Sequence, residues 1–448
     1  MEHPFEDGIN LRFFFNPVTL SRIVLPYIID RGPDYGKDLS SGLRDRGNPS
    51  GGRKKVIVEF SSSNIGQEFD SNHLRSTIIG MYIASLYGSM GWEAVRMNYL
   101  GDWGKHIGLL AAGWSRFGSE ELFEANPLEH LLDVFVKIRE LHQAERQDPS
   151  LINGHGIEAE KDEFFRKLED HDLDAIALWK RFRDASVESY VDIYARLNLA
   201  FDQYSGESDF SKEIIDKIES LLKEKGAYHE SDGAWIIDFA QLNIKGLPNG
   251  IARYRNGTTS YLLRDIAAFL ERSKKYSFDK MIYVASSRQE SHFNQLFRSL
   301  ELLGETDLDN RLKYLRFGML QGLEPSPNSS GLLLSDILNK CQSAAQTLLE
   351  VDHKSLPGFP QNNPKIADAL GITSLIIQDL SHRHNTQITI DVDKIATIDK
   401  HNGIALQQWY VALSVKLRGI SITREELDNA DLSIFAEEEY ADVLRVLI

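Results

Sequence analysis

The feature that most constrains this chain is a buried strand that runs through a polar turn into a helix. Residues 56–60, Val-Ile-Val-Glu-Phe, are almost wholly apolar, as in a strand covered on both faces. A polar turn follows over residues 61–66, and a helix is expected to begin near His73. In open α/β sheets such a turn lies where ligands bind. The turn has no glycine pair to cradle a phosphate, so the kind of ligand is left open.

Strand and helix patterns alternate along much of the chain. Further strands are predicted at residues 92–100, 233–239 and 280–286, with helical periodicity between them and after residue 332. This alternation predicts an α/β fold: a Rossmann-type parallel sheet that is split by a helical insertion and followed by a helical C-terminal region. The predicted parts are an N-terminal arm (1–55), a first sheet half (56–127), a helical connective insertion (128–230), a second sheet half (231–345) and a helical region (346–448).

Composition excludes several classes of protein. The 448 residues carry a net charge of −16, which disfavours broad, non-specific binding of nucleic acid, although a basic strip lies between Arg44 and Lys55. The single cysteine, Cys341, rules out an internal disulfide and a cysteine-based zinc site. No apolar run reaches the ~18 residues needed to span a bilayer, and the acidic N-terminus does not fit a signal peptide. A cytoplasmic protein without metal, DNA or membrane partners is therefore expected.

Four stretches together resemble the arginyl-tRNA synthetases of class I. They are VIVEFSSSNIGQEFDSNHLRSTIIG (56–80), VRMNYLGDWGKHIGLLAAG (95–113), ALWKRFRDASVESYVDIYARLN (177–198) and SYLLRDIAAFLERSKKYSFDKMIYVASSRQESHFNQLF (260–297). The similarity runs in order over most of the chain, and it implies the class I aminoacyl-tRNA synthetase catalytic fold. It also implies that the extra N-terminal domain of eukaryotic members is missing and that only the start of the anticodon-type helical bundle is present.

The resemblance fails at both positions where the family grips ATP. The His-x-Gly-His signature of the family reads Asp70-Ser71-Asn72-His73 in this sequence, so a carboxylate and a side chain replace a histidine and the glycine. A carboxylate ~4 Å from a phosphate costs ~1 kcal/mol even at high dielectric. The second signature is a lysine-bearing loop, but the matching run has no Lys or Arg between Arg316 and Lys340. These departures predict that ATP is not used and that no cofactor is needed.

The positions that match the family's arginine contacts are intact: Glu59, Asn64, Tyr261, Asp265 and Gln289. A guanidinium carries five donors in a planar fork, which Glu59, Asp265 and the Tyr261 hydroxyl are expected to bind. Asn64 and Gln289 are expected to contact the α-ammonium group. Taken singly, each residue also has an ordinary structural explanation, such as a surface carboxylate or a helix cap.

The turn over residues 98–108 is also kept, and the resemblance places it near the amino acid and the tRNA terminus. Lys105 and His106 are candidates for contacting terminal phosphates or for proton transfer, although a surface position without a role is the more common case for each alone. Trp103 is equally consistent with a place in the core.

An arginine pocket beside two altered ATP signatures is similar to the fungal arginine-containing cyclodipeptide synthases. That resemblance implies formation of a cyclo(Arg-Xaa) diketopiperazine from arginyl-tRNA and a second aminoacyl-tRNA, without ATP. His73 is the expected general base, with Asp70 holding its tautomer or taking protons itself. Ser71, or one of the serines over residues 61–63, is a candidate acyl-accepting nucleophile. Ser71 and Asp70 are also favoured helix caps, which is the simpler explanation of both.

Three other functions remain open from the sequence. The first is a working arginyl-tRNA synthetase with unusual signatures. The second is a non-catalytic regulator that binds arginine or arginyl-tRNA, and the third is a transferase that moves arginine from tRNA to another acceptor. No motif identifies a pocket for a second amino acid.

Overall fold

The computed structural model describes most of the chain: residues 5–7, 10–12, 15–67, 69, 71–152, 155–240, 244, 246–321, 334–351, 359–360, 362–391, 395 and 402–447. The chain divides into two compact units. One consists of residues 1–39 together with 410–448, and the other of residues 40–409.

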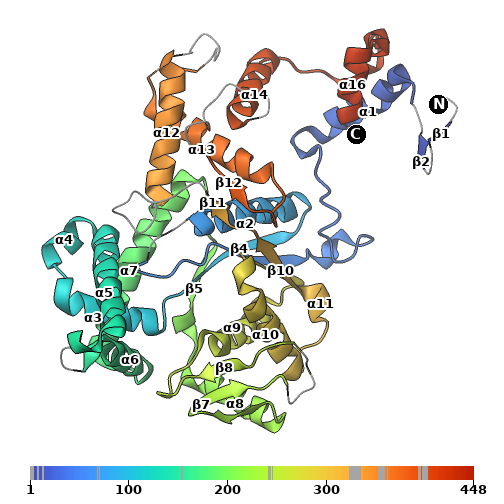
Figure 1. Cartoon of the computed structure of the whole chain (residues 1–448). Coiled ribbons are helices and arrows are strands. Elements are labelled where there is room, and N and C mark those ends of the chain that lie inside the picture. Colours follow the sequence, from blue (N-terminus) through green and yellow to red (C-terminus); the bar gives the residue numbers. More distant parts are fainter. Residues whose placement is uncertain are drawn as a thin grey trace. The chain divides into compact units, whose positions relative to one another are not determined.

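The larger unit is built on a five-stranded parallel sheet with the strand order β10-β9-β3-β4-β5. Its strands, some of which are labelled in Figure 1, are β3 (Lys55–Glu59), β4 (Glu93–Leu100), β5 (Gln203–Gly206), β9 (Lys280–Ser286) and β10 (Leu312–Phe317). The strand order reverses between β3 and β9, which is the point where doubly wound sheets bind their ligands. The predicted α/β fold with a parallel Rossmann-type sheet and helical regions is confirmed.

Both faces of the sheet are covered, as expected from the apolar run at β3. Val56 and Val58 point into one hydrophobic core, and Ile57 points into the other. The first core is closed by α2 (Ser71–Ser89), α7 (Leu173–Arg196), α12 (Leu334–Val351) and α13 (Pro364–Leu380). The second is closed by α8 (Lys212–Glu224), α9 (Tyr261–Tyr276) and α10 (Glu290–Leu302).

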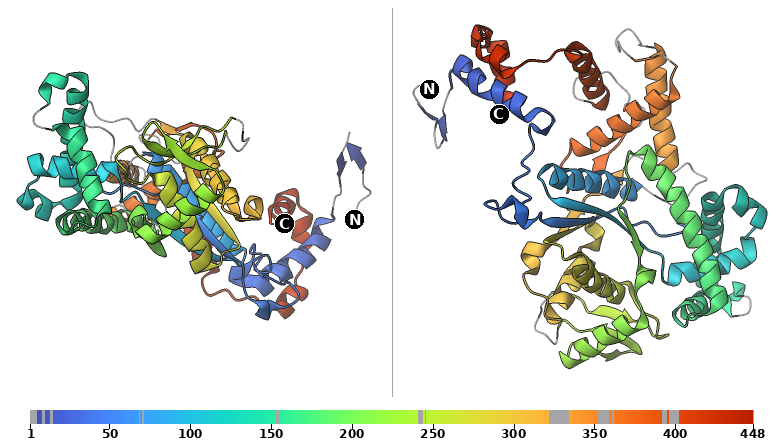
Figure 2. Two further views of the ribbon diagram at one scale, coloured as in Figure 1. Left: turned by 90° about the horizontal axis from the view of Figure 1, so that it is seen from below. Right: turned by 180° about the vertical axis from the view of Figure 1, so that it is seen from behind.

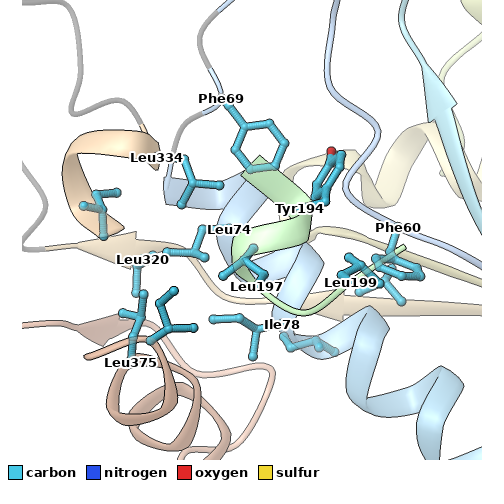
Figure 3. Close-up of a cluster of buried hydrophobic side chains, with 14 of the residues drawn as sticks. Phe60, Phe69, Leu74, Ile78, Tyr194, Leu197, Leu199, Leu320, Leu334 and Leu375 are labelled. Carbon is cyan, nitrogen blue, oxygen red and sulfur yellow. The ribbon is translucent and has the colours of Figure 1, made fainter. Parts of the chain in front are cut away.

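Figure 3 shows the centre of the first core, where parts of the chain far apart in sequence meet. Leu74 and Ile78 of α2 lie beside Tyr194 of α7, Leu334 of α12 and Leu375 of α13. All five side chains are at most 1% exposed. This packing fixes the start of α2 next to the end of β3.

The insertion between β4 and β5 is helical, as predicted. Its helices form a group beside the sheet in the views of Figures 1 and 2, and a separate apolar cluster around Trp103 holds them together. They are α3 (Lys105–Phe117), α4 (Glu120–Ala125), α5 (Pro127–Gln147), α6 (Gly156–Glu169) and α7.

Three parts of the strand prediction are wrong or incomplete. The stretch 233–239 does not join the parallel sheet, because β7 (Ala234–Ile237) pairs antiparallel with β6 (Tyr228–Ser231) and β8 (Gly250–Arg253). The sequence pattern also misses β5 and β10. Strand β5 has only four residues, which are too few to show a periodic pattern, and the sequence on both sides of it is helical.

The remaining elements complete the two units. In the larger unit they are α11 (Leu308–Arg311), the short parallel pair β11 (Leu320–Gln321) and β12 (Ile388–Thr389), and the first part of α14 (Gly403–Leu417). In the smaller unit, α1 (Pro17–Arg31) packs with α15 (Arg424–Asp428) and α16 (Glu438–Val446). The same unit contains an antiparallel hairpin of β1 (Phe5–Asp7) and β2 (Asn10–Arg12). The boundaries of the five predicted parts stay predictions. Within the described ranges, no helix combines the length and the apolar character that a bilayer crossing requires.

The contact between α2 and β3 can be tested at two glycines of α2. A methyl group on Gly80 would lie 2.1 Å from the ring of Phe60, whereas one on Gly88 would meet nothing within 4 Å. We expect Gly80→Ala to lower the free energy of unfolding by roughly 1–3 kcal/mol through overpacking. Gly88→Ala should raise it by roughly 0.5–1 kcal/mol, because alanine favours the helix. Urea denaturation measures both, and equal effects of the two variants would contradict this account of the packing.

Candidate functional site

A cavity of about 840 Å³ opens at the carboxyl ends of β3, β4 and β9. It therefore lies at the switch point of the sheet. Its wall is formed by the ends of these strands, the turn over residues 61–64, the first turns of α2, α9 and α10, and the loop after β5. All five residues predicted to bind arginine line it: Glu59, Asn64, Tyr261, Asp265 and Gln289.

Glu59, the last residue of β3, is already engaged by a cation of the protein itself. Its carboxylate accepts a short hydrogen bond from Arg272 of α9, and the two side chains are 10% and 6% exposed. The Arg272 guanidinium also lies 4.3 Å from the ring centre of Tyr99 and donates to Ser205. Burial raises the pKa of Glu59, and Arg272 counteracts that rise. The expected pairing of Glu59 with a bound guanidinium is thus partly replaced by an internal ion pair.

Asp265 retains a free acceptor. Its Oδ2 accepts a hydrogen bond from Nε2 of His292 at 2.8 Å, whereas its Oδ1 is buried and has no hydrogen-bond partner among the described residues. Tyr261, four residues earlier on α9, presents its ring to the same histidine at 4.9 Å. Tyr261 and Asp265 therefore present their side chains to the same cavity.

Glu207 is a cavity carboxylate that the sequence analysis does not identify. It begins the 3₁₀ turn directly after β5. Burial raises its pKa well above the usual range, and the nearby charges of Asp265 and Asp102 raise it further. In the sequence, Glu207 could be found only from its place at the carboxyl end of a parallel strand, and the sequence pattern does not predict strand β5. Glu207 and Asp265 are acids in one cavity, so a bound cation would favour the ionised form of Glu207.

Asn64 and Gln289 lie at two other edges of the cavity. Asn64 forms a parallel bridge with Gly101 and donates from its side-chain amide to Gln67 at 3.1 Å. A methyl group on Gly101 would fall 1.8 Å from the Asn64 side-chain oxygen, so only glycine permits this close approach. Gln289 is exposed at the end of the 3₁₀ turn that leads into α10.

The candidate catalytic residues are only partly brought together. Asn72 and His73 line the cavity, but Ser71 is not among its lining residues, and Asp70 lies outside the described residues, so its predicted contact with His73 stays a prediction. Ser61 reaches the cavity with its hydroxyl 2.6 Å from the hydroxyl of Tyr194. The run without Lys or Arg falls largely on residues 322–333, which also lie outside the described residues.

Lys105 and His106 are the first two residues of α3, and both side chains already contact other groups of the protein. Nζ of Lys105 is 3.0 Å from Asp162 and 4.6 Å from the ring centre of Tyr254. Nε2 of His106 lies 2.8 Å from the carbonyl oxygen of Gly101, and burial lowers the pKa of His106 to about 4. A neutral imidazole at physiological pH cannot supply a positive charge to phosphates, so the proposed phosphate contact does not suit His106.

Trp103 takes part in both the core and the cavity. It packs edge-on against Trp179 at 5.4 Å and is 6% exposed. Among the described residues, no group of three or more His, Cys, Asp or Glu side chains is arranged to hold a metal ion.

Comparison with solved structures defines the fold. The chain superposes on an arginyl-tRNA synthetase of Thermus thermophilus with a TM-score of 0.72 at 19% identity, covering 100% of this chain and 77% of the other. An arginyl-tRNA synthetase of Plasmodium falciparum gives a TM-score of 0.68 at 21% identity, covering 88% of this chain and 64% of the other. At these identities the match shows the fold alone, and the fold is that of the class I aminoacyl-tRNA synthetase catalytic domain.

Sequence comparison identifies the family. The model described as tRNA synthetases class I (R), catalytic domain, matches residues 39–392. The cytoplasmic arginine–tRNA ligase of Saccharomyces cerevisiae is 39% identical over 450 residues, covering 98% of this chain and 72% of the relative. A probable cytoplasmic arginine–tRNA ligase of Schizosaccharomyces pombe is 35% identical, covering 98% and 71%. The chain therefore belongs to the class I arginyl-tRNA synthetases.

These relatives overturn the functional expectation. Cyclodipeptide synthesis without ATP is wrong as the main interpretation, because the relatives that span nearly the whole chain are named as arginine–tRNA ligases. The second aminoacyl-tRNA has no support either. The changes at Asp70, Asn72 and the loop after Arg316 are local, whereas the similarity extends over 98% of the chain. The cytoplasmic location stays a prediction, since both cytoplasmic and mitochondrial relatives occur.

The first prediction from the site concerns the ion pair of Glu59. We expect Glu59→Gln to lower the free energy of unfolding by roughly 3–5 kcal/mol, because Arg272 would remain buried without a counter-charge. The matched control is Asp133→Asn, which breaks a 2.6 Å pair with Lys137 at the surface of α5 and should cost less than about 1 kcal/mol. Thermal and urea unfolding provide the measurement. An equal loss of unfolding free energy in the two variants would show that the Glu59–Arg272 pair is no more important for stability than a surface pair.

The second prediction concerns the raised pKa of Glu207. A bound guanidinium favours the ionised carboxylate, so arginine binding should release a proton, and affinity should fall as the pH falls through the raised pKa. Calorimetric titrations in two buffers with different ionisation enthalpies count that proton. Glu207→Gln should abolish the difference between buffers and weaken binding roughly tenfold or more. The same proton release from both proteins would exclude Glu207 as its source.

Proposed function

We propose that this chain joins arginine to tRNA in an ATP-dependent reaction. Arginine is the amino-acid substrate, and the acceptor end of a tRNA is the partner. The proposal rests on membership of the arginyl-tRNA synthetase family and on the chemistry of the cavity.

The observation that carries the substrate assignment is the excess of acceptors in the cavity. Asp265 Oδ1 is buried without a donor among the described residues, and the charge of Asp265 contributes to the raised pKa of the nearby Glu207. Glu59 is neutralised by Arg272, so two carboxylates remain for a ligand. Buried polar atoms without partners are rare in folded proteins and point to a missing partner. A guanidinium fits, because it is cationic and presents several donors in one plane.

This anchoring directs the other end of arginine toward the start of α2. Asn64 and Gln289 offer side-chain oxygens to its α-ammonium group. Its carboxylate then lies on the side of Asn72 and His73, where the helix N-terminus favours negative charge. In the proposed reaction this carboxylate attacks the α-phosphorus of ATP and pyrophosphate leaves. A terminal hydroxyl of tRNA next attacks the mixed anhydride and releases AMP.

The changes at Asp70 and Asn72 bear on ATP rather than on arginine. The family signature that residues 70–73 match grips ATP, so a carboxylate at position 70 is expected to oppose phosphate binding, and Asn72 lines the cavity. We therefore propose that the enzyme binds ATP weakly while it keeps an intact arginine subsite.

Aminoacylation of tRNA with labelled arginine tests the proposed function. The wild-type protein should form acid-precipitable arginyl-tRNA only when ATP is present. Asp265→Asn should raise KM for arginine at least roughly tenfold, because a charged hydrogen bond to the guanidinium is worth about 1.5–3 kcal/mol. Binding of arginine without any ATP-dependent charging would contradict the proposal.

A reverting variant forms the second arm of the same experiment. Asp70→His combined with Asn72→Gly should raise kcat/KM for ATP by at least about tenfold, which corresponds to about 1.4 kcal/mol. Asp133→His makes the same charge change on the exposed face of α5 and should leave this value unchanged. No gain from the double variant would exclude these two residues as the cause of weak ATP use.

A further inference from the structure

His292 contacts two of the predicted arginine ligands at once. It is the third residue of α10, and its Nε2 lies 2.8 Å from Asp265 Oδ2. Its ring lies 4.9 Å from the ring of Tyr261. Both contacts are to α9, so the histidine ties the two helices together at the cavity wall.

Asp265 and His292 form a hydrogen-bonded dyad, and one atom of each is left without a partner among the described residues. Asp265 Oδ1 and His292 Nδ1 are both buried, and neither has a hydrogen bond within the described part of the chain. When Nε2 of a neutral imidazole donates its proton, the other ring nitrogen carries a lone pair and is an acceptor. The dyad therefore presents acceptors only, and both residues line the cavity.

We propose that His292 is a positioning residue for arginine: by donating from Nε2 to Asp265 Oδ2, it keeps Asp265 Oδ1 available to the guanidinium. This proposal rests on the proposed function and adds a residue that acts through Asp265. The neutral imidazole is the competent form. A protonated ring turns the hydrogen bond into an ion pair that neutralises Asp265 and places a fixed cation beside the guanidinium subsite.

The charged and titratable groups around the dyad agree with this assignment. The acids and tyrosines are Asp265 and Tyr261 on α9, Glu59 with its partner Arg272, Glu207 after β5, and Tyr283 on β9. The cations are Arg264 on α9, which pairs with Glu169, and Arg288 just before α10. Apolar packing of the α10 terminus is supplied by the next residue, Phe293, which stacks on Tyr314 at 4.4 Å. The polar contact of His292 is therefore not needed to attach α10 to the sheet.

The chain offers a matched control in His142. Its Nε2 lies 2.7 Å from Glu158, and its side chain is 13% exposed, the same fraction as that of His292. This pair joins α5 to α6 and does not line the cavity. His142→Gln therefore repeats the chemical change of His292→Gln at a histidine–carboxylate pair that has no role in the proposal.

The experiment measures binding of L-arginine by calorimetry at pH 8 and pH 6, together with KM and kcat. At pH 8, His292→Gln should bind within about threefold of wild type, because its amide still donates to Asp265. His292→Leu should bind at least tenfold more weakly, with KM affected more than kcat. On acidification, the affinity of wild type should fall by a larger factor than that of His292→Gln, whereas His142→Gln should follow wild type.

The outcomes separate this proposal from the proposed function. Arginine binding with the same pH response in wild type and His292→Gln, or full affinity in His292→Leu, overturns the role of His292 and leaves the proposed function standing. Absence of arginine binding by the wild-type protein overturns the proposed function and this role with it. The expected pattern supports both.

Discussion

The ion pair between Glu59 and Arg272 is the interaction on which the site depends. It joins the last residue of the central strand β3 to the helix α9, and both side chains are almost completely buried. Such a pair contributes little net stability, but removal of either partner leaves a charge in a place of low dielectric. The pair therefore fixes α9 against the sheet, and with it the positions of Tyr261 and Asp265.

The same interaction determines what the cavity can bind. With Glu59 neutralised by the protein's own guanidinium, the carboxyl groups that remain for a ligand are those of Asp265 and Glu207. The charge of Asp265 raises the pKa of Glu207, and a ligand with several donors and a positive charge favours the ionised form of Glu207. Preference for arginine then follows from the arrangement of these two carboxylates and of the histidine that holds one of them.

Much of this could be predicted from the sequence, because it depends on local pattern. The apolar run at β3 marks a central strand, and the four-residue spacing of Tyr261 and Asp265 places both on one helical face. The partners of these residues are a different matter. Arg272 pairs with a residue 213 positions away, and His292 with one 27 positions away. Such pairings depend on how helices pack, which no local pattern encodes.

Glu207 shows the same limit in another form. Its strand, β5, has four residues and no apolar alternation, so nothing in the sequence indicates that the residue after it faces a ligand. The expectation of cyclodipeptide synthesis was wrong for a different reason. It depended on two local changes at the ATP signatures, whereas the family is shown by similarity along the whole chain.

The most direct test of the account compares L-arginine with L-citrulline, which has nearly the same shape but a neutral urea in place of the guanidinium. Calorimetric titration of the wild-type protein with each ligand at pH 8 measures the contribution of that charge. Because only a charged guanidinium pairs with Asp265 and favours the ionised form of Glu207, citrulline should bind at least about a hundredfold more weakly, or about 2.8 kcal/mol. Equal affinities would show that the charge on Asp265 and Glu207 does not select the ligand.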